Sequence, residues 1–519
     1  MSIRVFIALT DVQTLVEKIL IDDSFYEFSI SRSIANGKGT TYNGIDRTNS
    51  IHPLWIFLIT IPFFLTKNIY LAVNIILLFA SVIDAFTLLI IFKLTEKIFN
   101  SKTAFLTSML YGLNPFIIFQ ILSGMEVVVS VFFVMLSMYV YFSLKDRLTI
   151  KKAPIIGLVL GLSILARWDN VFLLIAILFC IFWDKRENLM VGLSLCIIIG
   201  SLAVLAFSPF LLWNFLNFGK ITLNSYTARY YMNHGIFPFF DLKPPTSFSD
   251  NLKLILENTY RGLGIILHQF GVINFDFLSP TALFPIFIAT VFLFSVKHMK
   301  KLKVGILYAI FIFSFYCFYF LGVQIRYFTP FMPIAFILFS IGLQNFCEKF
   351  FNNKYILGTI FLFFMGLVIW NATHQWNMGY FSWQREIYKD ALWLRENTTD
   401  SDVIGCFSSG IPTYFSEKRV VNLDGVLNAE AIEALRNKSV IPYMKSKNIT
   451  IWIDSVYFNQ TVANAYKNGL RFNVLENNLW KDFLGEGKEN LILIEQREGI
   501  YKHLRGFEML VIFFKAKVI

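Results

Sequence analysis

Long apolar runs separated by short polar loops make up most of residues 1–371. A run of roughly 17 to 25 apolar residues is long enough to cross the hydrocarbon core of a bilayer as an α-helix. Runs that reach or approach this length lie at residues 70–92, 103–122, 126–144, 153–167, 170–183, 190–213, 279–296, 304–322, 329–345 and 355–371. With a first segment from Ile3 to Ile21, which charged residues interrupt, the pattern predicts about eleven transmembrane helices.

The basic residues between these runs fall in alternate loops. They are Lys93, Lys97, Lys102, Lys145, Arg147, Lys151, Lys152, Lys185, Arg186, Lys297, Lys300, Lys301, Lys303, Lys349 and Lys354. Because lysine and arginine accumulate in cytoplasmic loops, these loops are predicted to face the cytoplasm. The first loop (22–69), a large loop (214–278) and everything after residue 371 are then predicted on the outer face. The apolar stretch from Pro53 to Leu65 would break the alternation if it crossed, so we expect it to lie in the membrane interface.

The pattern changes from residue 372 to residue 519. Strand-like runs now alternate with helical segments such as AEAIEALRNK; the strand-like runs are VIGCF, RVVNL, ITIWI, LILIE and MLVIFF. Alternation of this kind is typical of a small α/β domain. The chain is therefore predicted to be a polytopic α-helical membrane protein, with a membrane module over residues 1–371 and a soluble α/β domain over residues 372–519.

Composition agrees with this class and excludes others. The 519 residues are 56% hydrophobic and only 16% charged, which is more apolar surface than the core of a soluble domain absorbs. The net charge of +11 comes from lysines and arginines in short loops, so a nucleic-acid partner is not expected. The five cysteines form no CxxC pair, and no zinc site follows from them.

A polar stretch from Asp22 to Trp55 reads DDSFYEFSISRSIANGKGTTYNGIDRTNSIHPLW and follows the first apolar segment directly. It begins with two adjacent carboxylates, Asp22 and Asp23, continues with an amphipathic helical pattern around Tyr26 and closes with His52. Two adjacent carboxylates that are partly desolvated raise the pKa of one and leave the other ionised, which is how a general base active near neutral pH is made. The alternative for this pair is an interfacial anchor or a helix cap.

Other ionisable residues lie within the predicted spans or at their outer ends. Glu126 opens a span in SGMEVVVS and Asp84 lies within another in SVIDAFTL. Carboxylates in the membrane are costly and are functional candidates, although Asp84 could pair with a polar group of a neighbouring helix. Arg167 in ARWDN and Arg326 in IRYFTP could clamp a lipid phosphate, or could extend to the lipid headgroups. Arg229, in the large outer loop, is a weaker candidate.

The sequence contains no Walker loop, no GxGxxG motif between a strand and a helix, no GxSxG and no HExxH. An enzyme without a nucleotide site, whose reactive groups face outward, must take its activated substrate from the membrane itself.

A series of motifs extends in order over nearly the whole chain. They are Asp22-Asp23, FYEFSISRSIANGKGTTYNG, TNSIHPLW, SGME ending at Glu126, LARWDN at Leu165 to Asn170, SPFLLWNFLNFG at Ser208 to Gly219, RYFTP at Arg326 to Pro330 and VVNLDG at Val420 to Gly425. In these motifs the chain resembles the GT-C class of membrane glycosyltransferases, which includes protein O-mannosyltransferases, lipid A aminoarabinose transferases and mycobacterial arabinofuranosyltransferases.

The resemblance implies an activity and its location. Such enzymes move a sugar from a polyprenyl-phosphate donor to a hydroxyl of a glycan, glycolipid or protein, usually with inversion, on the outer face of the bacterial inner membrane or in the lumen of the endoplasmic reticulum. For this chain we expect the inner membrane, with membrane lipids, the donor and an extracytoplasmic acceptor as partners. The outer loops contain no DxD pair, so the resemblance implies no metal and no other cofactor.

The resemblance also assigns roles to residues. Asp22 would deprotonate the acceptor hydroxyl, and Asp23 would orient it. Arg326 is the first choice for the donor phosphate, followed by Arg167 and His52. The supporting residues would be Glu126, Tyr26, Arg229 and Asp84. A carboxylate beside the attacking hydroxyl and cations beside the leaving phosphate are what glycosyl transfer requires.

Two other readings of the sequence remain open. A transporter or flippase for a lipid-linked glycan would explain the many helices and Asp84, but the two halves of the chain show no internal symmetry of the kind many transporters have. A non-catalytic membrane scaffold would display the C-terminal domain to partners, and Asp22→Asn would then leave its phenotype intact.

Overall fold

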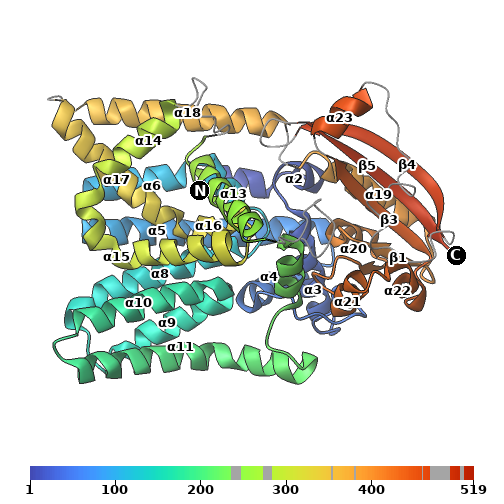
Figure 1. The fold of residues 1–519 in the computed structure, drawn as a ribbon, viewed down its shortest axis with the longest axis horizontal. Helices are drawn as coiled ribbons and strands as arrows, with labels where there is room; N and C mark the ends of the chain where they lie inside the picture. Colours follow the sequence, from blue (N-terminus) through green and yellow to red (C-terminus); the bar gives the residue numbers. More distant parts are fainter. Residues whose placement is uncertain are drawn as a thin grey trace.

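In the computed structural model, the described residues are 1–234, 247–272, 283–351, 355–378, 381–458, 460–467, 491–502 and 508–519. Long helices run side by side over the first part of the chain, and a five-stranded sheet with its helices lies beyond one end of this bundle (Figure 1). This arrangement confirms the predicted fold class, a polytopic α-helical membrane protein with a C-terminal α/β domain.

Six helical stretches of the described residues are long and apolar enough to cross a membrane. They are Ile69–Ile98, Val127–Arg147, Leu189–Phe218, Val296–Tyr319, Ile325–Phe350 and Ile356–Thr373. Helices α6 (Ser101–Gly112) and α7 (Pro115–Ile121) would make a seventh if they form one span, which bends by 64°. The predicted count of about eleven spans is therefore not confirmed.

The difference arises where polar residues divide or shorten an apolar run. The segment from Ile3 to Ile21 forms two seven-residue helices, α1 (Ser2–Ala8) and α2 (Val12–Lys18), because Asp11 caps the second by accepting a hydrogen bond from the Thr14 amide at 2.9 Å. The hairpin at 153–183 forms α9 (Ala153–Ala166) and α10 (Val171–Asp184), each of 14 residues. A helix of that length spans only about 21 Å. The predicted span at 279–296 begins outside the described residues.

The remaining helices of the first 378 residues complete the bundle and its loops. They are α5 (Ile69–Ile98), α8 (Val127–Leu144), α11 (Leu189–Phe218), α12 (Asn224–Asn233), α13 (Phe248–Gln269), α14 (Leu283–Leu293), α15 (Lys303–Ser314), α16 (Ile325–Phe328), α17 (Met332–Phe350) and α18 (Ile356–Met378). Because α18 continues to Met378, the boundary between membrane module and soluble domain that was placed after residue 371 falls inside a helix; these domain limits stay a prediction.

The predicted first outer loop contains two helices, α3 (Asp22–Ala35) and α4 (Pro53–Leu65). Two acidic residues in the first turn of α3 complement the positive end of its dipole. Most of α3 is buried, and the ring of Phe25 lies 5.5 Å from that of Tyr414 and 5.1 Å from that of Phe415. The amphipathic pattern of α3 is therefore explained by packing against the C-terminal domain.

The α/β domain is built on one mixed sheet. Its strands are β1 (Val403–Cys406), β2 (Arg419–Asn422), β3 (Ile451–Phe458), β4 (Leu491–Lys502) and β5 (Glu508–Val518), in the order β2-β1-β3-β5-β4. β1 runs parallel to β2 and β3, whereas β5 is antiparallel to β3 and β4. All five predicted strand-like runs fall on these strands.

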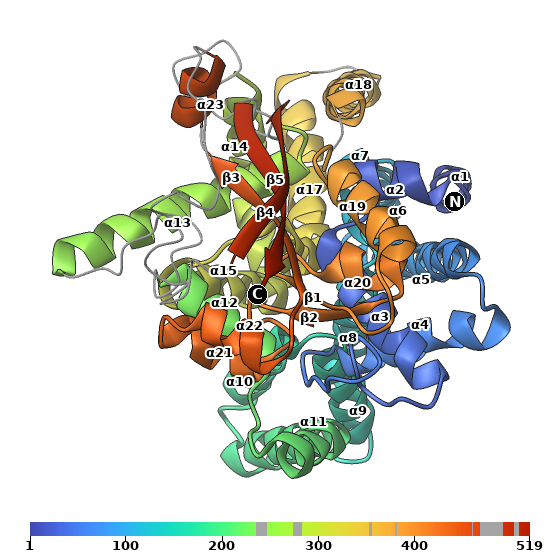
Figure 2. The ribbon, with the colours of Figure 1, turned by 90° about the vertical axis from the view of Figure 1, so that its right-hand side faces the viewer.

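In the described part of the domain, five helices accompany the sheet, and two of them face the membrane module. They are α19 (Gln384–Asn397), α20 (Gly410–Ser416), α21 (Ala429–Arg436), α22 (Val440–Ser446) and α23 (Gln460–Lys467). Figure 2 shows α19 and α20 to one side of β1 and β2 and α21 and α22 to the other. The Gln384 side chain accepts a hydrogen bond from the Asp22 amide at 2.8 Å and donates to the carbonyls of Val16 and Leu20. The domain is thus fixed directly over α2 and α3.

Candidate active site

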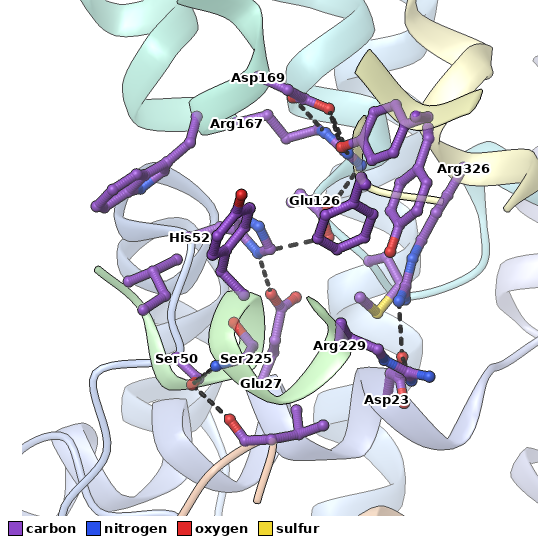
Figure 3. Close-up of a pocket in the computed structure, with 18 of the residues that line it drawn as sticks. Asp23, Glu27, Ser50, His52, Glu126, Arg167, Asp169, Ser225, Arg229 and Arg326 are labelled. Carbon is purple, nitrogen blue, oxygen red and sulfur yellow. Dashed lines mark hydrogen bonds and ion pairs between the residues drawn. The ribbon is translucent and has the colours of Figure 1, made fainter. Parts of the chain in front are cut away.

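A cavity of about 320 Å³ lies where the outer-loop helices meet the ends of the membrane helices and the α/β domain (Figure 3). Its ionisable lining residues are Asp23, Tyr26, Glu27, His52, Glu126, Arg167, Asp169, Tyr226, Arg229, Tyr316, Arg326 and Tyr327. Seven of the nine residues singled out from the sequence are among them. The two that lie elsewhere are Asp22 and Asp84.

Asp23 and two arginines form the first polar group on the cavity wall. Arg326 Nη2 donates to Asp23 Oδ2 at 2.8 Å, and Arg229 Nη2 lies 3.5 Å from the same oxygen. Burial raises the pKa of Asp23, but the two guanidinium groups outweigh this effect and hold the pKa below its ordinary value. Asp23 is therefore an ionised carboxylate at neutral pH, with cations beside it.

Asp22 points away from the cavity. Successive residues of an α-helix are turned by about 100° from one another, so adjacent side chains on α3 cannot face the same space. The Asp22 carboxylate instead accepts hydrogen bonds from the amides of Ile411 at 2.7 Å and Gly410 at 3.3 Å. Burial raises the pKa of Asp22 to about 7. Asp22 has no ion-pair partner among the described residues, so the geometry favours Asp23 over Asp22 for contact with a substrate.

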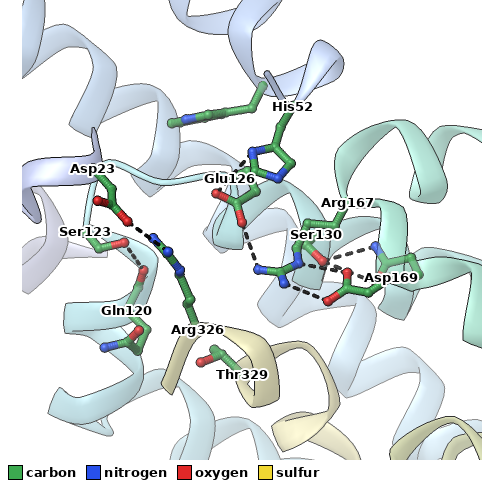
Figure 4. A network of polar contacts seen from close by, with 12 residues as sticks. Asp23, His52, Gln120, Ser123, Glu126, Ser130, Arg167, Asp169, Arg326 and Thr329 are labelled. Atoms are coloured by element: carbon green, nitrogen blue, oxygen red, sulfur yellow. Dashed lines mark hydrogen bonds and ion pairs between the residues drawn. The ribbon is translucent and has the colours of Figure 1, made fainter. Parts of the chain in front are cut away.

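Arg167 is held by a dense set of acceptors (Figure 4). It binds Asp169 through Nε at 2.9 Å and Nη2 at 2.6 Å, and its Nη1 donates to Glu126 at 2.8 Å. The hydroxyl of Tyr316 donates to Asp169 at 2.7 Å. Since most of its donors are already used, Arg167 is better placed to fix Glu126 than to receive a phosphate. Arg326 has only Asp23 as an ion-pair partner in the described part of the chain and is the stronger candidate for an anion.

Glu27, His52 and Glu126 form a second polar group on the cavity wall, which Arg167 connects to Asp169. His52 Nδ1 lies 2.9 Å from Glu27 Oε1 and 3.6 Å from Glu126 Oε2. Burial raises the pKa of Glu27 to about 7. Burial lowers the pKa of His52, but the two carboxylates outweigh it and raise that pKa above its ordinary value. One ligand atom from each of the three residues lies within 4.8 Å of the others, a spacing that could hold a metal ion.

Local backbone features bring this group together. Glu27 follows Asp23 by four residues and therefore lies on the same face of α3. His52 precedes Pro53, the first residue of α4, where a proline is well accommodated. Gly124 has φ +82°, and a Cβ there would lie 2.8 Å from the Phe28 ring and the Ser24 side chain. Only glycine lets the loop before Glu126 press this closely against α3.

The rest of the cavity wall is apolar and aromatic. It includes Phe172, Leu223, Tyr226, Phe315, Phe320 and Tyr327. Phe315 and Tyr316 belong to a π-helical turn at Phe315–Tyr319, a feature that often marks functional sites because it redirects side chains. Such a surface suits an apolar chain and the C–H faces of a sugar ring, next to the charged groups.

The α/β domain completes the cavity. Val426 and Leu427, which follow the VVNLDG motif, line it. Ser50 Oγ donates to the Val426 carbonyl at 2.5 Å and accepts from the Ser225 amide at 2.8 Å, which ties the first outer loop to the domain and to α12. Tyr26 accepts a hydrogen bond from the Ser409 amide at 3.2 Å. The site is therefore shared between the membrane module and the C-terminal domain.

Asp84 has a separate structural environment. It lies within α5, forms an ion pair with Arg4 and accepts a hydrogen bond from the Tyr111 hydroxyl at 2.6 Å. Arg4 also donates to the Gly112 carbonyl at 2.8 Å. This arrangement matches the alternative considered for Asp84, pairing with a neighbouring helix.

Several polar residues of the cavity were not predicted from the sequence, namely Glu27, Asp169, Ser50, Ser225 and Tyr316. Two of them had a usable signal. Glu27 follows Asp23 by one helical turn, and Asp169 lies two residues after Arg167 in the motif that was already singled out. The others approach the cavity only through the fold.

Comparisons with known proteins agree with this description. Residues 52–213 match the family model of dolichyl-phosphate-mannose-protein mannosyltransferases, and residues 375–490 match a domain of unknown function. No curated protein sequence matches the chain.

Among solved structures, ArnT from Cupriavidus metallidurans bound to undecaprenyl phosphate superposes with a TM-score of 0.58 at 10% identity, over 99% of this chain and 96% of that one. The oligosaccharyltransferase AglB from Archaeoglobus fulgidus, in complex with an inhibitory peptide and a dolichol-phosphate, gives a TM-score of 0.50 at 12% identity, over 89% of this chain and 69% of that one.

The family match over residues 52–213 and the fold shared with these two proteins agree with the GT-C resemblance drawn from the sequence. The long apolar helices of the chain make it a multi-pass membrane protein.

Proposed function

We propose that the protein is an inverting glycosyltransferase that moves a sugar from a polyprenyl-phosphate donor to a hydroxyl of an extracytoplasmic glycan, glycolipid or protein. The observation that carries this proposal is the contact between Asp23 and Arg326 in the wall of a cavity with an aromatic side. A proton acceptor and a cation thus lie next to each other where an apolar chain can also be accommodated.

In the proposed reaction, Asp23 takes the proton of the acceptor hydroxyl. The hydroxyl oxygen then forms a bond to C1 of the sugar while the bond from C1 to the phosphate oxygen breaks. The electron pair of that bond leaves with the polyprenyl phosphate, and a single in-line displacement inverts C1. Arg326 and Arg229 are placed to stabilise the charge that develops on the phosphate.

The proton transfer is helped by the same arginines. In the resting site they bind the carboxylate of Asp23 and hold its pKa down, so that it is free of a proton. When a phosphate arrives, it competes for the guanidinium groups, and the carboxylate becomes a better base. Asp22 takes no part in this scheme, because its carboxylate is bound to the amides of Gly410 and Ile411.

A lipid-linked donor is supported by the chemistry of the cavity and by its relatives. Phe172 and Phe315 provide an apolar wall near the membrane helices for a prenyl chain. The matched family is described by a dolichyl-phosphate-linked sugar, and ArnT and AglB were solved with polyprenyl phosphates. The basic loops at the other end of the helices support an outer-facing site in the inner membrane.

A transfer assay tests this proposal. Purified full-length protein in nanodiscs is incubated with radiolabelled polyprenyl-phosphate mannose, or in parallel with polyprenyl-phosphate aminoarabinose, together with a membrane extract as acceptor. We expect label to appear in the extract with wild type and with the exposed control Asp400→Asn, and not with Asp23→Asn. Equal transfer by Asp23→Asn, or movement of label across the membrane without transfer when the protein is reconstituted into vesicles, would overturn the proposal.

A further inference from the structure

We propose that Glu27, His52 and Glu126 bind a divalent transition-metal ion in the wall of the cavity. This inference deepens the proposed function, and rests on it only for the role of the ion in receiving an anionic donor. The site joins three segments of the chain, since α3 supplies the first residue, the start of α4 the second and the start of α8 the third.

The geometry is compact enough for one ion. One nitrogen and two carboxylate oxygens from these residues lie within 4.8 Å of one another. Ligands of an ion bound at about 2.0–2.2 Å from each donor are separated by less than that span. Small rotations of the side chains are therefore sufficient to close the coordination, and the backbone need not move.

Two carboxylate oxygens in this group have no hydrogen-bond donor. Glu27 Oε2 and Glu126 Oε2 are buried and accept no hydrogen bond from any residue in the described ranges. Glu27 is 4% exposed and Glu126 is 2% exposed. The nearest charged group to Glu126 Oε2 that forms an ion pair with it is His52, at 3.6 Å, beyond hydrogen-bond distance. A buried carboxylate oxygen without a hydrogen bond is costly, and a cation bound between the two carboxylates would offset this cost.

The groups around the site hold its ligands in place. Arg167 donates to Glu126 Oε1 at 2.8 Å, so that the other oxygen of Glu126 is the one turned towards His52. Arg167 is itself fixed by Asp169. Outer partners of this kind orient the ligands of metal sites. His52 presents Nδ1 to both carboxylates, which makes Nδ1 the coordinating nitrogen.

The net charge of the cavity also favours a bound cation. Four carboxylates, those of Asp23, Glu27, Glu126 and Asp169, face three guanidinium groups. In the protonation state that a metal requires, with all four carboxylates ionised and His52 neutral, the cavity without the ion carries one net negative charge. That charge would repel a phosphate-linked donor. A divalent ion changes it to one net positive charge, which attracts the donor.

The ligand types select the ion. One imidazole nitrogen and two carboxylates suit Mn²⁺ or Zn²⁺ better than Ca²⁺ or Mg²⁺, which prefer oxygen alone. Three protein ligands leave a coordination position, and the cavity lies on the open side of the group. This site could not be predicted from the sequence, because the three ligands are separated along the chain and contain no DxD pair. The proposed metal site differs from the sequence-based expectation of no metal, which rested on the missing DxD pair.

A competing explanation is a protonated His52 that bridges Glu27 and Glu126 without any ion. Metal-binding measurements on the protein alone separate the two. Full-length protein in nanodiscs is stripped with EDTA, dialysed and titrated with Mn²⁺, with the free ion followed by its EPR signal. Zn²⁺ is measured in parallel by mass spectrometry of the protein after gel filtration. The variants are Glu27→Gln, His52→Gln and Glu126→Gln, with surface Glu433→Gln as the matched control.

We expect one tightly bound ion per chain for wild type and for Glu433→Gln. Each of the three site variants should weaken Mn²⁺ and Zn²⁺ binding at least tenfold, and bound Mn²⁺ should raise the Tm of wild type but not of Glu27→Gln. Three variants on separate segments keep the test decisive if one of them misfolds. Absence of stoichiometric binding by wild type, or unchanged binding by the folded site variants, would overturn the proposal.

The metal-binding measurement is independent of the transfer reaction, because it contains no sugar donor. A protein that transfers sugar but binds no ion refutes only the metal site. A protein that binds the ion at these residues but transfers no sugar refutes only the proposed function.

Discussion

Arg326 Nη2 donates to Asp23 Oδ2 at 2.8 Å, although 303 positions separate the two residues in the sequence. One residue lies near the start of α3 and the other at the start of a late membrane helix, and their contact closes one side of the cavity. This long-range contact, rather than a local sequence pattern, identifies Asp23 as the carboxylate of the Asp22-Asp23 pair that lines the cavity.

Replacing Asp23 tests this choice against its neighbour. Asp23→Asn removes the proton acceptor and is expected to lower the transfer rate at least about 100-fold, the usual contribution of a positioned general base. Asp22→Asn changes a side chain outside the cavity and should retain transfer within a few-fold, at a temperature at which both variants are folded. Rates measured with the same donor decide between them. Loss of transfer in Asp22→Asn alone would return the catalytic role to Asp22.

Asp22 and Asp23 are adjacent in the sequence, so only the structure could show which of the two faces the cavity. The motif indicated that one carboxylate of the Asp22-Asp23 pair is used, but two neighbouring residues of a helix point in different directions. Which one faces the cavity depends on where α20 lies, and α20 is almost 400 residues away in the chain: Gly410 and Ile411 follow Asp22 by 388 and 389 positions.

Several features of the fold and of the site could be predicted from the sequence. The strand runs of the C-terminal domain, and motif positions such as Glu126, Arg167 and Arg326, were found because their signals are local. The number of spans could not be predicted correctly from the sequence. A helix cap such as Asp11 divides an apolar run into two short helices, and the hydropathy of the run does not show this division. The proximity of Glu27 to Glu126 also needed the fold, because 99 positions separate the two residues and no local pattern links them.

The contact between α20 and α3 predicts how the C-terminal domain is held. A Cβ added at Gly410 would lie 2.1 Å from the Asp22 carbonyl oxygen, so Gly410→Ala must push α20 away from α3. We expect a loss of about 1–3 kcal/mol in stability, as in overpacked contacts, and faster limited proteolysis of the domain. Gly264→Ala is the matched control, because no atom lies within 4 Å of its added Cβ. Equal proteolysis of the two variants would contradict the docking described.

The α/β domain should lose stability as pH rises. Burial raises the pKa of Asp454 to about 7, while the unfolded chain has the ordinary value of about 3.9. Between these values the folded domain binds more protons than the unfolded chain, so the free energy of unfolding falls as pH increases, by on the order of a few kcal/mol. The contribution is full below pH 4 and is lost as pH passes 7. Thermal unfolding measured at pH 5.5 and pH 8 gives this slope.

Asp454→Asn should reduce this pH dependence, whatever constant change in Tm it causes, and the remaining slope should come from Asp424, because burial raises the pKa of that carboxyl to about 7 as well. The exposed Asp400→Asn should keep the slope of wild type. If Asp454→Asn keeps the full slope as well, Asp454 is not the group responsible.

The ion pair between Arg4 and Asp84 is predicted to be structural. Arg4→Leu leaves the buried Asp84 carboxylate without its cation and is expected to cost about 3–5 kcal/mol. The double variant Arg4→Leu with Asp84→Leu removes both charges and should be more stable than Arg4→Leu alone. Unfolding of detergent-solubilised protein measures both, and transfer by the folded double variant should persist. A double variant that is folded but inactive would show that Asp84 has a functional role.

The most direct test of the central claim is a structure of the full-length protein with undecaprenyl phosphate, determined in nanodiscs by electron cryo-microscopy. The account predicts phosphate density inside the cavity, within hydrogen-bond distance of the Arg326 guanidinium and adjacent to Asp23, with the prenyl chain along the wall that contains Phe172 and Phe315. Phosphate density that contacts neither Arg326 nor Arg229, or that lies outside this cavity, would contradict it.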